Sequence, residues 1–220
     1  MSRMLAGLFS MLLLLVLWSP AVASAQSPDA QATPISPGAA AIDARLPSAL
    51  QSAGDYCLMT DGILIERFPF AGIGMGEALR LDGSRWFCEY TGSPEAEPPS
   101  SRISISLTTL YSETPTLATL AYLVRPSIPD TVDTPDLATW YCAYLGGSSD
   151  FGGNSGGGGG WASDPANPEA TVIGICVFPD GSAIDNWGLA YHAQGVIRGA
   201  NLAPLIRYQP GVIPDYVFPR

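Results

Sequence analysis

The chain has 220 residues, of which 47% are hydrophobic and 14% are charged, and it carries 24 Gly and 20 Pro. This much Gly and Pro interrupts extended helices and excludes fibrous and long coiled-coil proteins, while the apolar content excludes wholesale disorder. The ten basic residues are all Arg, and against 20 carboxylates they leave a formal net charge of −10, which argues against nucleic acid as a partner.

The first 25 residues have the pattern of a secretory signal peptide. Arg3 precedes an apolar run from Leu5 to Trp18, and small residues at 23–25 form a cleavage site. The apolar run is shorter than the roughly 20 residues that span a bilayer, so we expect no integral membrane segment after cleavage. The sequence therefore predicts a secreted or periplasmic protein. Residues 26–45, rich in Ala, Pro and Ser, are predicted to form a flexible linker.

Two segments of the chain resemble each other. Tyr-Cys at 56–57 recurs at 141–142, 85 positions later, and Leu-Ala-Thr-Leu at 117–120 recurs as Leu-Ala-Pro-Leu at 202–205 with the same offset. A Cys-x-aromatic pair lies between these anchors in each segment. Matches in one order at a fixed offset predict an internal duplication.

The duplication predicts two tandem small modules of the α+β class. Each module should contain an N-terminal helix, short antiparallel strands and a following helix, and one disulfide should staple each module. The predicted boundaries are module one at 47–123, a linker at 124–131, module two at 132–208 and a Pro-containing tail at 209–220.

In module one, the start signal Leu46-Pro47-Ser48 and the stop signal Asp61-Gly62 predict a first helix. Short strands are expected at 63–68, 78–81 and 86–90. The stretch from Ile103 to Leu107 is ambiguous, because its apolar residues alternate as in a strand but also have helical spacing with Leu110. Residues 117–123 are predicted to form a short helix or turn.

In module two, Thr134 is expected to cap a helix that has Pro135 and Asp136 in its first turn, and Gly146-Gly147 ends that helix. A strand is expected over 171–178. A further helix is expected over 184–191, where Ile, Trp and Tyr have helical spacing.

Four Cys in a secreted chain imply two disulfides, with three possible pairings. Each predicted module owns one helix Cys and one strand Cys. A pairing older than the duplication must therefore join Cys57 to Cys88 and Cys142 to Cys176. The chain has no Cys-x-x-Cys motif and a single His, so we expect structural disulfides, with no metal site and no cofactor.

The string Cys-Val-Phe-Pro-Asp-Gly-Ser at 176–182, with Tyr-Cys and Gly-Gly before it, resembles a small bacterial extracytoplasmic domain family of unknown function that carries the label hemolysin. In that family an acidic residue and a Trp follow the string, and Asp185 and Trp187 occupy these places here. The resemblance covers about 135–190, with module one as a degenerate copy, and it implies no catalytic residue.

One motif suggests a serine hydrolase. Residues 153–157 read Gly-Asn-Ser-Gly-Gly and match G-x-S-x-G at Ser155, and the only histidine, His192, lies downstream. A nucleophile elbow needs a strand before the Ser and a helix after it, whereas more Gly follow Ser155. The sequence therefore favours a Gly-rich loop here.

No convergent set of catalytic groups is evident in the sequence. We therefore predict a secreted, non-enzymatic protein that binds a protein or envelope ligand through loops at 68–78 and 148–170. A membrane-active, hemolysin-like factor is an alternative suggested by the family label, although the acidic charge and the lack of a long amphipathic segment oppose it. A hydrolase using Ser155 and His192 is the other alternative.

Overall fold

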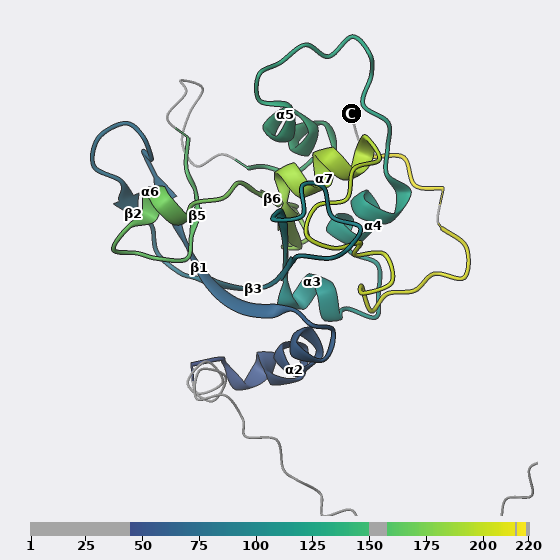
Figure 1. Ribbon diagram of the computed structural model, residues 1–220, viewed down its shortest axis with the longest axis horizontal. Coiled ribbons are helices and arrows are strands. Elements are labelled where there is room, and N and C mark those ends of the chain that lie inside the picture. The colour runs from purple at the N-terminus through teal and green to yellow at the C-terminus, as the bar shows by residue number, and fades with distance from the viewer. Residues whose placement is uncertain (1–44, 150–157, 214, 219–220) are drawn as a thin grey trace, which may run out of the picture. The chain divides into compact units, whose positions relative to one another are not determined.

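The computed structural model describes residues 45–149, 158–213 and 215–218 (Figure 1). The predicted signal peptide at 1–25 and, apart from its last residue, the predicted linker at 26–45 lie outside these residues. The described residues all belong to one compact unit.

The protein is α+β, as predicted. Its elements are η1 Ser48–Leu50, α2 Gln51–Met59, β1 Ile63–Ala71, β2 Leu79–Arg80, β3 Arg85–Thr91, β4 Arg102–Ser106, α3 Leu107–Tyr111, α4 Leu117–Val124, α5 Leu137–Tyr144, β5 Gly160–Ala162, α6 Pro168–Thr171, β6 Ile175–Val177, β7 Ala183–Asp185 and α7 Asn186–Ala193. Within the described residues, every helix is too short or too polar to cross a membrane.

The strands form one seven-stranded sheet in the order β2-β1-β3-β4-β7-β6, with β5 also paired to β1. Figure 1 shows β1 as a long curved strand. Its residues 63–67 pair with β3, and its residues 68–71 pair with β5 and β2. Trp161 of β5 also exchanges backbone hydrogen bonds of 2.9 and 3.1 Å with Ile173, just before β6. The sheet therefore curls, and β5 links β1 to the segment before β6.

The curled sheet has two faces, because side chains alternate along each strand. The outer face packs against the helices and contributes residues such as Leu64, Cys88, Ile105 and Ile184 to the main core. On the opposite face, which we call the inner face, a smaller apolar cluster consists of Phe87, Trp161, Ile175 and Ala183. Buried polar residues in register with this cluster are Arg67, Glu89, Ser104 and Asp185.

The structure contains the two disulfides that the sequence predicts, Cys57–Cys88 and Cys142–Cys176. Each has a glycine five residues after its helical Cys. The N–H groups of Gly62 and Gly147 both donate at 2.9 Å to the carbonyl of that Cys. A Cβ at either glycine would press on the disulfide sulfurs, so both positions require a residue without a side chain.

Each of the two strands that carry a disulfide Cys pairs with a strand that places an Ile opposite that Cys. Strand β3 places its Cys opposite Ile105 of β4, and β6 places its Cys opposite Ile184 of β7. Strands β4 and β7 then pair with each other through the same two Ile. The residue after each Ile caps a helix, Ser106 before α3 and Asp185 before α7. Both predicted modules therefore contribute strands to one continuous sheet.

Several predicted elements differ from the structure. The ambiguous stretch 103–107 is a strand that gives way to a helix, because Ser106 ends β4 and caps α3. The strand predicted over 171–178 is limited to β6, since Pro168–Thr171 is helical. Extending the last helix to Ile184 was wrong, because this residue lies in β7. Residues 117–124 form helix α4, whereas 202–205 form turns.

Candidate functional site

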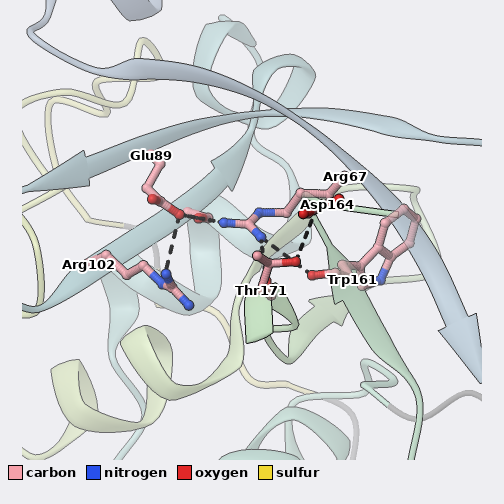
Figure 2. Close-up of polar contacts among 7 residues, drawn as sticks. Arg67, Glu89, Arg102, Trp161, Asp164 and Thr171 are labelled. Carbon is pink, nitrogen blue, oxygen red and sulfur yellow. Dashed lines mark hydrogen bonds and ion pairs between the residues drawn. The ribbon is translucent and has the colours of Figure 1, made fainter. Parts of the chain in front are cut away.

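A buried ion pair lies on the inner face of the sheet. Arg67 of β1 is 1% exposed, and its Nη2 donates to Oε2 of Glu89 in β3 at 2.5 Å (Figure 2). Ser104 of β4 donates its hydroxyl to the same oxygen at 2.8 Å. Because a buried charge is stable only when it is paired and hydrogen-bonded, these three side chains act as one unit.

Arg67 also holds the segment that follows the Gly-rich stretch. Its Nη1 donates to the carbonyl of Thr171 at 3.2 Å and to that of Trp161 at 3.4 Å (Figure 2). The hydroxyl of Thr171 in turn accepts the N–H of Asp164 at 3.0 Å. Burial is the largest influence on the pKa of Arg67 and lowers it. One buried cation therefore fixes residues 158–172 to β1.

A pocket of about 410 Å³ opens between β4, β7 and α7. Its polar and aromatic lining consists of Arg102, Asp185, Trp187, Tyr191 and Arg198. Residues 172–174, which continue the segment held by Arg67, form another wall. The volume lies in the range of roughly 300–1,000 Å³ that is typical of small-molecule sites.

Two glycines allow the walls of the pocket to approach each other. A Cβ on Gly188 would meet the side chain of Ile103 at 2.6 Å, so the glycine lets α7 lie close to β4. A Cβ on Gly174 would meet the side-chain amide of Asn186. The backbone N–H of Asn186 donates to the Gly174 carbonyl at 3.1 Å. The start of α7 is therefore fixed against both β4 and the segment before β6.

Asp185 places a carboxylate at the start of α7. It is 6% exposed, and its Oδ1 accepts the N–H of Gly188 at 2.7 Å as the helix N-cap. Burial is the dominant influence and raises the pKa of Asp185 to about 6, against the capping hydrogen bond and the positive charges of Arg198, Arg102 and Arg67. The pocket therefore contains a hydrogen-bond acceptor whose charge changes near pH 6.

Two arginines supply positive charge to the pocket. The Arg198 guanidinium lies 4.9 Å from the ring centre of Tyr191, and its buried Nε has no hydrogen-bond partner among the described residues. The Arg102 side chain is 43% exposed, and its Nε lies 4.0 Å from Glu89 (Figure 2). At this distance Arg102 and Glu89 form an ion pair without a close hydrogen bond.

An aromatic surface adjoins these charges. Trp187 is 39% exposed, and its ring centre lies 5.6 Å from that of Tyr191 at an interplanar angle of 33°. The Arg198 guanidinium makes a cation–π interaction with the ring of Tyr191. The pocket thus combines two guanidinium groups, one carboxylate and an indole that solvent reaches.

The residues of the predicted hydrolase do not form a described site. Ser155 lies outside the described residues. His192 stacks on Tyr122 with ring centres 3.8 Å apart and an interplanar angle of 2°. Burial, together with the charge of Arg125, lowers the pKa of His192 to about 4. This environment accounts for a neutral histidine packed on α4.

The predicted binding loops are only partly related to the pocket. Residues 172–174 directly follow the predicted loop at 148–170, whose described end is held by Arg67. The predicted loop at 68–78 includes the end of β1, and its residues do not line the pocket. Asp136, which the sequence places at a helix start, caps α5 by accepting the N–H of Thr139 at 3.1 Å.

Sequence reasoning singled out part of the pocket. The sequence singled out Asp185 and Trp187 as the acidic residue and the Trp that follow the Cys-Val-Phe-Pro-Asp-Gly-Ser string, and both line the pocket. Arg102 and Arg198 were missed, because they lie far apart in the sequence and no local motif contains either. Comparisons of the chain with protein-family models, curated proteins and solved structures found no match.

Proposed function

We propose that the chain is a secreted, non-enzymatic binding protein that holds a small anionic ligand in the pocket beside α7. The observation that carries this proposal is the presence of two guanidinium groups, Arg102 and Arg198, in one concave site. Among the side chains that the structure describes, neither arginine forms a close, hydrogen-bonded ion pair. A guanidinium presents a planar fork of donors that matches a carboxylate or phosphate.

The charge balance of the pocket supports an anion. Arg67 and Glu89 compensate each other on the inner face. In the pocket itself, two guanidinium charges and the carboxylate of Asp185 leave one positive charge when Asp185 is ionised. The whole chain has a formal charge of −10, so its long-range field repels anions. Attraction of an anion must therefore come from the local positive charge of the pocket at short range.

The pocket favours binding over hydrolysis. His192, the histidine of the hydrolase alternative, stacks on Tyr122 and does not line the pocket. The acid that does line the pocket, Asp185, already accepts the capping N–H of α7. These placements support fixed recognition groups better than a nucleophile and base in hydrogen-bond contact.

The proposed setting is outside the cytoplasm. Two disulfides fit an oxidising compartment, and the signal-like sequence at 1–25 supports export. The resemblance of residues 135–190 to the hemolysin-labelled extracytoplasmic family supports the same setting.

We infer further that the two predicted modules are copies of one ancestral unit. The equivalent disulfides, the glycines beside them and the paired Ile105 and Ile184 support this inference. When β4 and β7 are aligned on these two Ile, Asp185 and Trp187 correspond to Ser106 and Thr108. On this proposal only the second copy carries the acidic and aromatic groups of the pocket.

Titration with acetate tests the anion site. The disulfide-bonded protein is followed by amide ¹H–¹⁵N spectra at constant ionic strength while sodium acetate is added. We expect saturable shifts at Gly174, which lines the pocket, and at Gly188, whose N–H donates to Asp185. Replacing Arg198 with Ala should weaken binding about tenfold or more, because a charge-assisted hydrogen bond is lost.

Arg45→Ala is the matched control, because it removes an equal charge from an exposed residue outside the pocket. This variant should bind acetate as the native protein does. Shifts that do not saturate, or equal dissociation constants for Arg198→Ala and Arg45→Ala, would contradict the proposal.

A further inference from the structure

The geometry points to an acidic sugar, a pyranose carrying one carboxylate, as the ligand of the pocket beside α7. This inference rests on the proposed anion-binding function and adds the chemistry of the rest of the ligand. It follows from three kinds of group that line one pocket: the two arginines, the carboxylate of Asp185 and the exposed ring of Trp187.

The first requirement is a single negative charge. Arg102 and Arg198 together carry two positive charges, and ionised Asp185 carries one negative charge. A monoanionic ligand therefore neutralises the pocket. A zwitterionic amino acid carries no net charge and would leave one guanidinium without a counter-charge in a partly buried site, which is unfavourable.

The second requirement is a hydroxyl donor. Asp185 is 6% exposed and lines the pocket, and its Oδ1 already accepts the N–H of Gly188. An ionised carboxylate has acceptor capacity for several hydrogen bonds and donates none. A ligand must therefore offer O–H or N–H groups to this oxygen pair. The hydroxyl groups of a sugar ring meet this need without adding positive charge.

The third requirement is a flat face with little polarity. Trp187 lines the pocket and is 39% exposed, although a large apolar side chain gains free energy from burial. The C–H groups on one side of a pyranose ring form such a face, and their slight positive charge suits the negative face of an indole. The neighbouring Tyr191 is held in place by Arg198, with the guanidinium 4.9 Å from its ring centre.

These three requirements separate an acidic sugar from simpler anions. Acetate and phosphate satisfy the arginines but leave Trp187 exposed. A neutral sugar can cover Trp187 and donate to Asp185, but it leaves the positive charge without a partner. Of these ligands, only the acidic sugar meets all three requirements.

Calorimetric titration of the full disulfide-bonded protein tests the inference with galacturonate, glucuronate, galactose, acetate and alanine as probes. At least one of the two uronates should bind about tenfold or more tighter than acetate, and galactose should bind about tenfold or more weaker than that uronate. Replacing Trp187 with Ala should remove the advantage of the uronate, so that the ratio of uronate to acetate affinity falls to about one. Met59→Ala, at an exposed position on α2, is the control for loss of an exposed apolar side chain.

The outcomes separate this inference from the proposed function. If acetate binds and neither uronate binds more tightly, the acidic-sugar inference is wrong while the anion pocket stands. Alanine binding as tightly as the better uronate would also overturn the inference, because a zwitterion would then suit the site. If no probe binds, both proposals are wrong. Amide spectra of each variant confirm that it is folded before its affinity is compared.

Discussion

Replacing Asp185 with Asn should change how the stability of the protein depends on pH. Burial raises the pKa of Asp185 from 3.8 to about 6, so between these pH values the folded state binds more protons than the unfolded state. The contribution of this group is therefore fully present below about pH 4 and is lost as pH rises through 6. At 1.36 kcal/mol for each pKa unit, the loss is about 3 kcal/mol at most.

His192 acts in the opposite direction. Its pKa falls from 6.5 to about 4 on folding, so the folded state binds fewer protons than the unfolded state between these values. Its contribution to stability is present above pH 6.5 and is lost as pH falls through 4. Because the ring is only partly buried, solvent screening makes this contribution smaller than the nominal shift suggests. The two groups therefore offset each other in the native protein.

The Asp185→Asn variant keeps the helix cap, since Asn is as good an N-cap as Asp, but removes the titrating group. The unfolding free energy of the variant minus that of the native protein should increase by about 3 kcal/mol as the pH rises from 4 to 7. Urea unfolding followed by circular dichroism, with the disulfides intact, measures this difference at several pH values.

Asp136→Asn is the matched control for loss of a capping carboxylate, because Asp136 is an exposed N-cap. A difference between Asp185→Asn and the native protein that is the same at pH 4 and pH 7 would refute the reasoning. So would a variant that is less stable than the native protein at pH 7.

Three further predictions concern the scaffold. Gly147→Ala puts a methyl group 2.5 Å from Sγ of Cys176 and should lower the unfolding free energy by about 1–3 kcal/mol, whereas Gly211→Ala, with nothing within 4 Å, should change the urea midpoint little. Glu89→Gln leaves the buried charge of Arg67 without its counter-ion and should cost about 3–5 kcal/mol; an unchanged Tm would show that the pair is not buried in solution. Reducing both disulfides opens loops with separations of 31 and 34 residues, each worth about 3.7 kcal/mol in the chain-entropy model, so a Tm insensitive to reductant would contradict a stapling role.

Local signals in the sequence were sufficient for several elements. The stop signal Asp61-Gly62 marks the end of α2. Helix α5 begins two residues later than predicted, because Asp136 and not Thr134 is its N-cap. The ambiguity at 103–107 had a physical origin, because the segment is a strand and then a helix, with Ser106 as the junction. A single periodicity could not describe it.

Long-range features were beyond local reasoning. Strand β5 has three residues, and its pairing with β1 depends on a partner about 90 positions earlier, as in Pro69 opposite Trp161. The pocket joins Arg102 to Arg198. The segment that contains Arg198 lies beside β4 because Gly199 donates its N–H to the hydroxyl of Ser101 at 3.0 Å and α7 packs on β4. No window of the sequence contains both arginines, so their shared site could be recognised only in three dimensions.

The pairing of Ile105 with Ile184 at the middle of the sheet has a consequence for ancestry. Equivalent residues that pair with each other are the mark of an isologous contact, such as the one between subunits of a twofold homodimer. On the duplication proposal, a polypeptide with a single copy would leave this strand as an open sheet edge and would need a second subunit to cover it. Fusion into one chain makes that assembly independent of protein concentration. It also frees the two halves to diverge, so that one half can keep the scaffold while the other acquires a binding site.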